Sequence, residues 1–315
     1  MKINLTDTAR LLHDAQTVIL TSHIRPDGDS IGSTLGLMHF LRSLGKEARV
    51  LIDDELPRTF RVLPGLDTIE RPEEGQRYTA DLLVVCDVEL RRTGAVVPSV
   101  DALRVLNIDH HVTNDEEAEY LYLDPSRAAT CEIMCEIIRE MGGTCSLDMA
   151  TCLYTGIATD TGFFRFSNTT PHTMRTAADL IEIGVKPNII SVAMEMKSYD
   201  EVMAQVRAIR NLEMFYDGKV AAVFIDEERA KEVKTTEGLL DKLRVIEGTQ
   251  IVFFMKWLEH DTYRVSMRSK GVNVSRIAQE FDGGGHIRAA GCTLHAPFDE
   301  ARSMILAAIG RALSE

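Results

Sequence analysis

Apolar and polar residues follow two different periods along the first half of the chain. Short apolar runs have the length and β-rich composition of strands buried on both faces, and they lie at 17–20, 48–52, 81–87 and 103–109. Other segments carry apolar residues at helical spacing and end at glycines or turns; they lie at 31–45, 129–143 and 146–160. Strands that alternate with helices are typical of a mostly parallel sheet covered by helices. This half is therefore predicted to have an α/β fold.

The pattern changes after residue 184. Pro187 marks the start of a connecting helix, and further strands are expected at 219–226, 249–259 and 262–269, followed by a helix at 273–281. We predict a catalytic domain at 1–188, a connecting helix or linker at 189–212, and a second, smaller α/β domain at 213–315. The second domain is expected to lie across a cleft from the first.

Composition and charge narrow the class of protein. Of 315 residues, 45% are hydrophobic and 26% charged, as in ordinary globular proteins. The net charge of −13 argues against a protein that coats long nucleic acid, because such binding depends on many Lys and Arg contacts to phosphates. The chain has no signal-like N-terminal stretch and no apolar run of the ~18 residues that a membrane span needs. Six cysteines without C-x-x-C spacing favour reduced thiols, so we expect a cytoplasmic protein that does not bind membranes.

Potential metal ligands follow the ends of several predicted elements. The loop HIRPDGDSIGS follows the first strand, although a PDGD string is also a common solvated turn. An isolated aspartate ends DLLVVCD, and the aspartate that ends LRVLNID is followed directly by two histidines. Another aspartate ends the helix at 146–160. In open α/β sheets ligands bind at the carboxyl ends of strands, so these side chains are expected to converge. The candidates are His23, Asp27, Asp29, Asp87, Asp109, His110, His111 and Asp160.

The residue types indicate which ions such a site would bind. Carboxylates with two imidazoles suit Mn²⁺ best, with Mg²⁺, Fe²⁺, Co²⁺ and Zn²⁺ as alternatives, because softer ions prefer thiolates. Two cations ~3.5–4 Å apart activate water and hold a phosphate for in-line attack. The sequence therefore predicts two divalent cations and a hydrolytic reaction at phosphorus.

The C-terminal part contains a candidate phosphate site. In FDGGGHIRAAGC (281–292) three glycines precede a histidine, so that backbone N–H groups could approach an anion; a turn without a ligand is the alternative. Between 264 and 288 five basic residues outnumber two acidic ones, which could serve one or two phosphates. The basic residues are Arg264, Arg268, Lys270, Arg276 and Arg288. Phe163, Phe164 and Phe166 could stack a base, although core packing is favoured for at least two of them.

The strings HIRPDGDSIGS, VVCD, IDHH and TDTG, in this order and at these spacings, resemble the four motifs of the DHH phosphoesterases. The resemblance implies that His23 and Asp27 hold one metal, that Asp29, His110 and Asp160 hold the other, and that Asp87 bridges both. It also implies that His111 contacts the substrate phosphate or protonates the leaving oxygen, and that Asp109 orients the two histidines.

VSMRSKG and GGGHIRAAG resemble the DHH-associated C-terminal domain, so the resemblance covers nearly the whole chain. It implies that the far phosphate or base of a short substrate contacts Arg268, Ser269, Gly284, Gly285 and His286, with Arg288 as a further candidate.

This two-domain arrangement most resembles the oligoribonuclease and 3′-phosphoadenosine-5′-phosphate phosphatase group. The implied substrates are short single-stranded RNA and small nucleotides. Alternatives are a phosphodiesterase acting on cyclic di-AMP or linear pApA, a manganese pyrophosphatase, against which GGGH argues, and a DNA exonuclease. A non-catalytic nucleotide-binding sensor is the alternative from another class. The sequence leaves open the physiological metal, the direction of degradation and the oligomeric state, for which a homodimer is one option.

Overall fold

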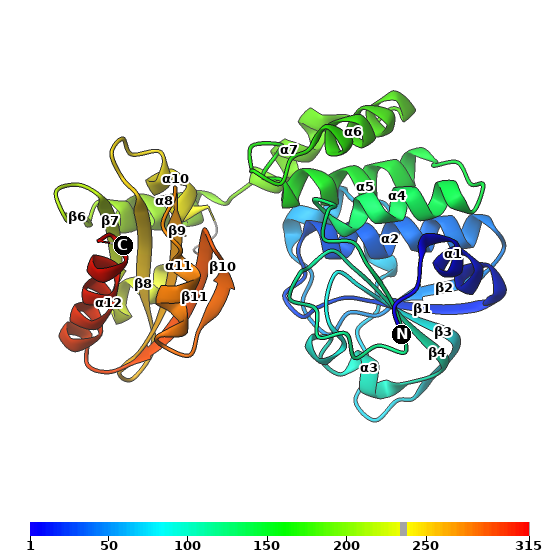
Figure 1. Ribbon diagram of the computed structural model, residues 1–315, viewed down its shortest axis with the longest axis horizontal. Helices are drawn as coiled ribbons and strands as arrows, with labels where there is room; N and C mark the ends of the chain where they lie inside the picture. The colour runs from blue at the N-terminus through cyan, green and yellow to red at the C-terminus, as the bar shows by residue number, and fades with distance from the viewer. Residues whose placement is uncertain (234–237, 315) are drawn as a thin grey trace. The chain divides into compact units, whose positions relative to one another are not determined.

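The computed structural model describes residues 1–233 and 238–314, and the side chain of His286 lies outside the described part. The chain forms two compact units, Met1–Met196 and Lys197–Glu315 (Figure 1). Each unit has its own sheet and its own apolar core, and helices pack against both sheets. The α/β fold class with a second, smaller α/β unit is confirmed.

The first unit is built on a five-stranded sheet in which all neighbouring strands are parallel. The strand order is β2-β1-β3-β4-β5. Strand β3 shows why the sheet forms, since its Leu82–Cys86 run is buried throughout, as expected for a strand covered on both faces. The strands are β1 (Thr17–Thr21), β2 (Glu47–Val50), β3 (Tyr78–Cys86), β4 (Val100–Asp109) and β5 (Tyr120–Leu123).

Helices α2, α4 and α5 share one large apolar core with this sheet, and α6 packs on the outer side of α5 (Figure 1). Helix α2 is buried on nearly all sides, because it lies between the sheet and α5. A smaller core covers the opposite face of the sheet. The helices are α1 (Leu5–Asp14), α2 (Gly28–Ser43), α3 (Val96–Ser99), α4 (Thr130–Glu140), α5 (Leu147–Asp160), α6 (Pro171–Ile183) and α7 (Pro187–Glu195).

Glycines allow α2 and α5 to pack closely. A Cβ on Gly32 of α2 would lie 2.5 Å from the carbonyl oxygen of Cys152 in α5. A Cβ on Gly156 of α5 would lie 2.8 Å from Oδ1 of Asp29. Such contacts are too short for any side chain, so glycine at these positions brings α5 directly against the first turn of α2.

The four strands expected in this half are present, as are all three helices, with shifted ends. The largest difference concerns α2, which begins at Gly28 rather than near Ile31. The carboxylate of Asp27 accepts hydrogen bonds from the backbone N–H groups of Asp29 and Ser30, and so caps the helix three residues early. Asp29 therefore lies in the first helical turn and not in a loop.

The second unit contains a six-stranded mixed sheet in the order β10-β11-β9-β8-β7-β6. Only β7 and β8 are parallel; the other neighbouring pairs are antiparallel. The expected strands correspond to β7, β8 and β9. The strands are β6 (Leu212–Phe215), β7 (Val220–Ile225), β8 (Ile251–Glu259), β9 (Thr262–Ser269), β10 (Gly284–His286) and β11 (Ala289–His295).

Helices cover both faces of this second sheet. Helices α11 and α12 pack on one face, and α8, α9 and α10 pack on the β6–β8 side of the other. The helices are α8 (Tyr199–Ile209), α9 (Glu227–Glu232), α10 (Leu239–Arg244), α11 (Val274–Gln279) and α12 (Phe298–Ala312). None of the helices in residues 1–233 and 238–314 has both the length and the apolar character that a membrane crossing requires.

Candidate metal centre

The carboxyl ends of β1, β3 and β4 deliver polar side chains to one edge of the parallel sheet. His23 follows β1, Asp87 follows β3 directly, and Asp109 ends β4 and is followed by two histidines. The first turn of α2 and the last residue of α5 reach the same edge, because these two helices pack against each other. The structure thus brings together all six residues expected as metal ligands.

The first group of potential ligands consists of His23, Asp27 and Asp87. His23 Nε2 lies 3.6 Å from Asp27 Oδ2 and 3.8 Å from Asp87 Oδ2. Nδ1 of His23 lies 2.9 Å from the carbonyl oxygen of Ile24, which can only accept a hydrogen bond, so Nδ1 carries the proton. In neutral His23 the Nε2 lone pair is therefore directed at the two carboxylates.

The second group consists of Asp29, His110 and Asp160. His110 Nε2 lies 3.4 Å from Asp160 Oδ2 and 3.9 Å from Asp29 Oδ2. Nδ1 of His110 donates to the carbonyl oxygen of Arg127 at 3.2 Å, so in the neutral ring the lone pair lies on Nε2. Nε2 is buried, and the described residues offer it no hydrogen-bond partner. A buried nitrogen with its lone pair directed at carboxylates is the arrangement expected of a metal ligand.

Asp87 lies between the two groups. Its Oδ2 faces His23, and its Oδ1 lies 3.5 Å from Nε2 of His110. Asp87 has a positive φ of 65°, a conformation that aspartate tolerates better than most residues, and its side chain is only 2% exposed. The hydroxyl of Thr130 donates to Oδ1 at 3.0 Å and holds the carboxylate in place. One carboxylate can therefore serve both groups.

The N-terminus of α4 holds Asp29. Its two carboxylate oxygens accept hydrogen bonds from the backbone N–H groups of Thr130 at 2.6 Å and Cys131 at 2.9 Å. These are among the N–H groups that have no partner within the helix, and the helix dipole favours a negative charge there. Asp29 is 1% exposed, and the two hydrogen bonds fix both oxygens of its carboxylate.

The electrostatics of the cluster favour a cation. Burial, and then repulsion from Asp29 and Asp27, raise the pKa of both Asp87 and Asp160 well above the ordinary range. Ligand atoms about 2.1 Å from one ion are separated by roughly 3–3.5 Å, close to the 3.4–3.9 Å found between the nitrogens and oxygens of these groups. The side chains fit a pair of divalent cations, whose charge would remove the repulsion.

Asp109 and His111 form a hydrogen-bonded pair at the edge of the cluster, where His111 also forms a third group of potential ligands with Asp87 and His110. Asp109 is fully buried, and its Oδ1 accepts hydrogen bonds from the backbone N–H groups of both histidines and from Nδ1 of His111 at 2.8 Å. Asn114, itself bonded to Asn107, donates to Oδ2 at 2.6 Å. Burial alone would lower the pKa of His111, but the hydrogen bond and charge of Asp109 raise it above 6.5. His111 thus resembles an acid oriented by a buried carboxylate.

Sequence reasoning missed three of the residues that build this site. The hydroxyl of Thr130 positions Asp87, and Asn107 and Asn114 form the amide pair that fixes Asp109. The start of the helix at 129–143 was a usable signal for Thr130, because helix N-termini attract carboxylates. No local pattern singles out Asn107 or Asn114, since they meet only through the fold.

The aromatic residues after Asp160 divide between two environments. Phe163 and Phe164 pack against the core of the first unit, and the Phe164 ring lies 5.9 Å from that of Tyr154. Phe166 lies over Gly162, where a Cβ would approach the ring to 2.4 Å. The preference for core packing of at least two of these rings is therefore supported.

The C-terminal candidates lie on β9, β10 and the turn after β10. Strand β11 separates β9 from β10, pairing Ala289 with Arg268 and Gly291 with Gly284. Gly285 has a φ of 137°, and a Cβ there would lie 2.5 Å from the carbonyl oxygen of Ala289, so strand pairing already requires glycine. Gly284 has open space where a Cβ would lie, which leaves its backbone accessible. The side chain of His286 lies outside the described residues.

Arg268 and Ser269 point to opposite faces of β9. Ser269 is buried, and its hydroxyl donates to the carbonyl oxygen of Val272 at 2.5 Å, so it serves the fold of the following turn. Arg268 alternates with Met267, which lies in the core under α11 and α12, and so projects from the other face. Burial lowers the pKa of Arg268, and Asp241 only partly offsets this effect. The backbone carbonyl of Arg288 accepts from Ser269 N–H, and the Arg288 side chain is exposed.

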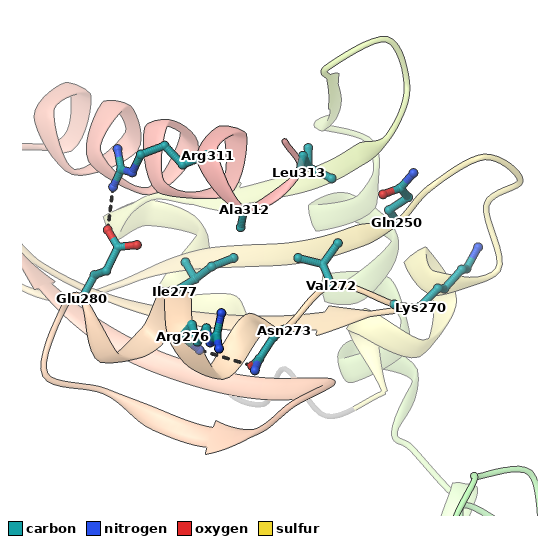
Figure 2. Close-up of a pocket in the computed structure, with 11 residues that line it drawn as sticks. Gln250, Lys270, Val272, Asn273, Arg276, Ile277, Glu280, Arg311, Ala312 and Leu313 are labelled. Atoms are coloured by element: carbon teal, nitrogen blue, oxygen red, sulfur yellow. Dashed lines mark hydrogen bonds and ion pairs between the residues drawn. The ribbon is translucent and has the colours of Figure 1, made fainter. Parts of the chain in front are cut away.

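The five basic residues between Arg264 and Arg288, expected to serve one or two phosphates, do not all lie on one face of the sheet. Lys270 and Arg276 line a pocket of about 590 Å³ beside α11 and α12 (Figure 2). Arg268 projects from the face of β9 opposite the core that α11 and α12 cover. Lys270 Nζ donates to the carbonyl of Ile246 and to the hydroxyl of Thr249, and Arg311 in the same pocket pairs with Glu280. These basic residues therefore do not form a single patch, because strand alternation in β9 and the position of α11 direct them to different places.

An open parallel sheet with carboxylates and imidazoles gathered at its carboxyl edge, followed by a second α/β unit, defines a metal-binding α/β protein of two units. The chain belongs to the DHH family: residues 17–157 match the DHH family N-terminal domain and residues 217–315 match the DHHA1 domain. The resemblance drawn from the motifs is thereby confirmed.

Relatives of similar length match nearly the whole chain. The bifunctional oligoribonuclease and PAP phosphatase NrnA of Thermus thermophilus is 35% identical over 94% of this chain and 90% of its own length. The protein of the same name from Bacillus subtilis is 29% identical over 94% of this chain and 95% of its own. Among solved structures, an exopolyphosphatase-related protein from Bacteroides fragilis superposes with a TM-score of 0.88 at 24% identity, covering 98% of this chain and 95% of that one. This last likeness supports the fold.

The titratable groups of the cluster predict how stability depends on pH. The pKa values of Asp87, Asp160 and His111 are raised, as is that of His23 through its contact with Asp27, although burial opposes the shift in both histidines. A group with a raised pKa stabilises the fold below its unfolded value, and that stability is lost as pH rises through the folded value. The loss of stability begins near pH 3.8 for the aspartates and near pH 6.5 for the histidines, the ordinary pKa values of these groups. We expect metal-free protein to become less stable from about pH 4 upward.

This expectation is checked by thermal melting in EDTA at pH 5 and pH 8. Asp27, whose pKa the contact with His23 lowers to about 2 against the effect of burial, acts only in stronger acid and does not disturb the comparison. Mn²⁺ competes with protons for these side chains, so its stabilising effect should be larger at pH 8. The Asp87→Ala variant should show a weaker pH dependence. If the stability of the parent and of Asp87→Ala depended equally on pH, the dependence would arise from charges outside the cluster.

Proposed function

We propose that the chain is a metal-dependent phosphoesterase that hydrolyses very short oligoribonucleotides and 3′-phosphoadenosine 5′-phosphate. The observation that carries the proposal is the convergence of six potential ligands from separate strand and helix ends into neighbouring groups, with Asp87 facing His23 of one group and His110 of the other. Membership of the DHH family and the names of the full-length relatives support the same activity. The six cysteines, all free thiols, are compatible with a cytoplasmic enzyme.

In this proposal His23 and Asp27 would hold one cation, and Asp29, His110 and Asp160 would hold the other. Asp87 would serve both. Carboxylates combined with imidazoles favour Mn²⁺ over softer ions. When bound, a pair of such ions supplies an activated water and neutralises charge on the phosphate.

Two further residues of the site are proposed to transfer a proton to the leaving oxygen and to orient the ring that carries it. We assign to His111 the donation of a proton to the leaving oxygen, or a contact to the phosphate. Asp109 holds Nδ1 of His111 at 2.8 Å and so leaves Nε2 for this role. Because Asp109 keeps the pKa of His111 raised, the ring holds its proton at higher pH than a free histidine.

For the second unit we propose a role in substrate binding. The domain boundaries proposed are 1–188 for catalysis, 189–212 for the connection and 213–315 for binding. Arg268 and the accessible backbone of Gly284 flank β11 and are the best-supported contacts for a phosphate, with Gly285, His286 and Arg288 nearby in sequence. Ser269 would act indirectly, through the turn that its hydroxyl holds.

A substrate panel tests the proposed activity. Protein loaded with Mn²⁺ is incubated with pyrophosphate, 3′-phosphoadenosine 5′-phosphate, cyclic di-AMP, linear pApA and RNA of two to ten nucleotides. We expect the highest kcat/KM for the shortest RNAs and for 3′-phosphoadenosine 5′-phosphate. A preference for cyclic di-AMP or pyrophosphate would replace the proposal with one of those activities. Tight nucleotide binding without turnover would indicate a sensor.

The role of Arg268 leads to a prediction about substrate binding. Replacing Arg268 with alanine should raise KM for a dinucleotide about 10-fold or more, because a charge-assisted hydrogen bond contributes about 1.5–3 kcal/mol. KM for bis-p-nitrophenyl phosphate, which lacks a second nucleotide, should change little. Arg175→Ala, at an exposed arginine of α6, serves as the matched control. Equal changes in KM for both substrates would exclude a contact between Arg268 and the far end of the substrate.

A further inference from the structure

Asn168 connects two backbone segments that carry ligands of the same group. Its side-chain Nδ2 donates to the carbonyl oxygen of Asp160 at 3.1 Å and to that of Ala128 at 3.2 Å. The two acceptors belong to different parts of the unit, the end of α5 and the segment before α4. One amide group therefore fixes the distance between them.

Both contacts lead directly to a potential metal ligand. Asp160 is the last residue of α5, and its own carbonyl is among those that a helix end leaves without an internal partner. Ala128 follows Arg127, whose carbonyl accepts from Nδ1 of His110. The amide thus restrains the backbone of Asp160 and the segment whose carbonyl holds the His110 ring. Nε2 of His110 and Oδ2 of Asp160 lie 3.4 Å apart.

The chemistry of the contacts requires a donor at this position. Both partners of Nδ2 are carbonyl oxygens, so turning the amide over would place oxygen against oxygen. Oδ1 is buried, and the described residues offer it no donor. A buried acceptor without a donor destabilises the fold, so asparagine is a poor choice here for packing alone.

The other group of ligands is held by different contacts. His23 is fixed by the carbonyl of Ile24, and Asp27 by the first turn of α2. Neither contact involves residues 127–128 or the end of α5. A change at Asn168 should therefore act first on His110 and Asp160 and not on His23 or Asp27.

We propose that Asn168 is a positioning residue that sets the geometry of the Asp29–His110–Asp160 group and so controls the affinity of one cation of the pair. The inference rests on the proposed two-metal function. Partners behind metal ligands typically contribute 10–100-fold in metal affinity, so the loss of this amide should weaken one ion by about that factor. The ion held by His23 and Asp27 should keep its affinity.

The experiment measures Mn²⁺ binding and not turnover. Parent protein, Asn168→Ala and Asn168→Asp are freed of metal and titrated with Mn²⁺ by calorimetry, and magnetic coupling between the two ions is followed by electron paramagnetic resonance. We expect two ions in the parent, and in Asn168→Ala one ion of parent affinity and a second weakened about 10–100-fold with loss of coupling. Asn168→Asp should be affected more, because a carboxylate would face two carbonyl oxygens.

Asn188→Asp, at an exposed asparagine of α7, is the matched control and should bind both ions like the parent. A parent protein that binds fewer than two Mn²⁺ contradicts the two-metal function itself. If the parent binds two ions and Asn168→Ala binds both with unchanged affinity, the positioning role is excluded. Equal weakening of both ions, with or without a lower melting temperature in EDTA, would also exclude it, because it would indicate a general structural role.

Discussion

Replacement of Asp87 with alanine is expected to reduce kcat/KM by at least about 10³-fold, because the carboxylate faces both ligand groups and metal ions supply several kcal/mol of transition-state stabilisation. The fold should survive. Burial and the neighbouring carboxylates raise the pKa of Asp87 in the metal-free protein, so removing its charge should leave thermal stability in EDTA equal to that of the parent or higher. Turnover is measured with a dinucleotide in Mn²⁺, and stability by thermal melting in EDTA.

Two comparisons make the Asp87 result decisive. Asp67→Ala, at an exposed aspartate of the same unit, should retain parental activity. Calorimetry should show that Asp87→Ala binds Mn²⁺ more weakly in both steps. Parental turnover in Asp87→Ala would refute the shared role of this carboxylate.

Replacement of His111 with alanine should lower kcat by about 10²–10⁴-fold, the usual contribution of a general acid. The stoichiometry of Mn²⁺ should stay at that of the parent, because His111 lies outside the sets proposed to hold the ions. The loss should be large for a dinucleotide and small for bis-p-nitrophenyl phosphate, whose leaving group departs without a proton. His13→Ala, at an exposed histidine of α1, is the control.

The same experiment separates two possible roles of the ring. An equal loss with both substrates would mean that His111 acts on the phosphate and not as an acid. Loss of bound Mn²⁺ in His111→Ala would instead make the ring a ligand, an arrangement that its 3.7 Å distance to Asp87 also permits.

The sequence predicted the first unit well because its signals are local. Each buried parallel strand is a continuous apolar run, and the ligand candidates stand directly after such runs, as Asp87 does after β3. Parallel strands place their carboxyl ends at one edge, so the convergence of the ligands followed from topology alone. The apolar pattern places the start of α2 three residues too late, because Asp27 is both a potential ligand and the cap of the helix.

The second unit was harder to predict because its features depend on strand pairing. A count of charges between Arg264 and Arg288 could not reveal that β9 and α11 direct them to different faces of the sheet. Nor could a run of glycines show that Gly285 is required by the approach of Ala289, while Gly284 is not crowded. Asn168 lies in an unremarkable polar turn, and its role depends on two carbonyls that are distant in the sequence.

The anchoring of Asp29 on the N-terminus of α4 has a consequence for ion size. A carboxylate tied at both oxygens to a helix cannot move outward to lengthen a coordination bond. Ca²⁺ takes six to eight oxygen ligands at about 2.3–2.6 Å in variable geometry, whereas Mg²⁺ takes octahedral bonds of about 2.0–2.1 Å. If the proposed pair of cations binds here, we expect the fixed carboxylate of Asp29 to disfavour larger ions such as Ca²⁺.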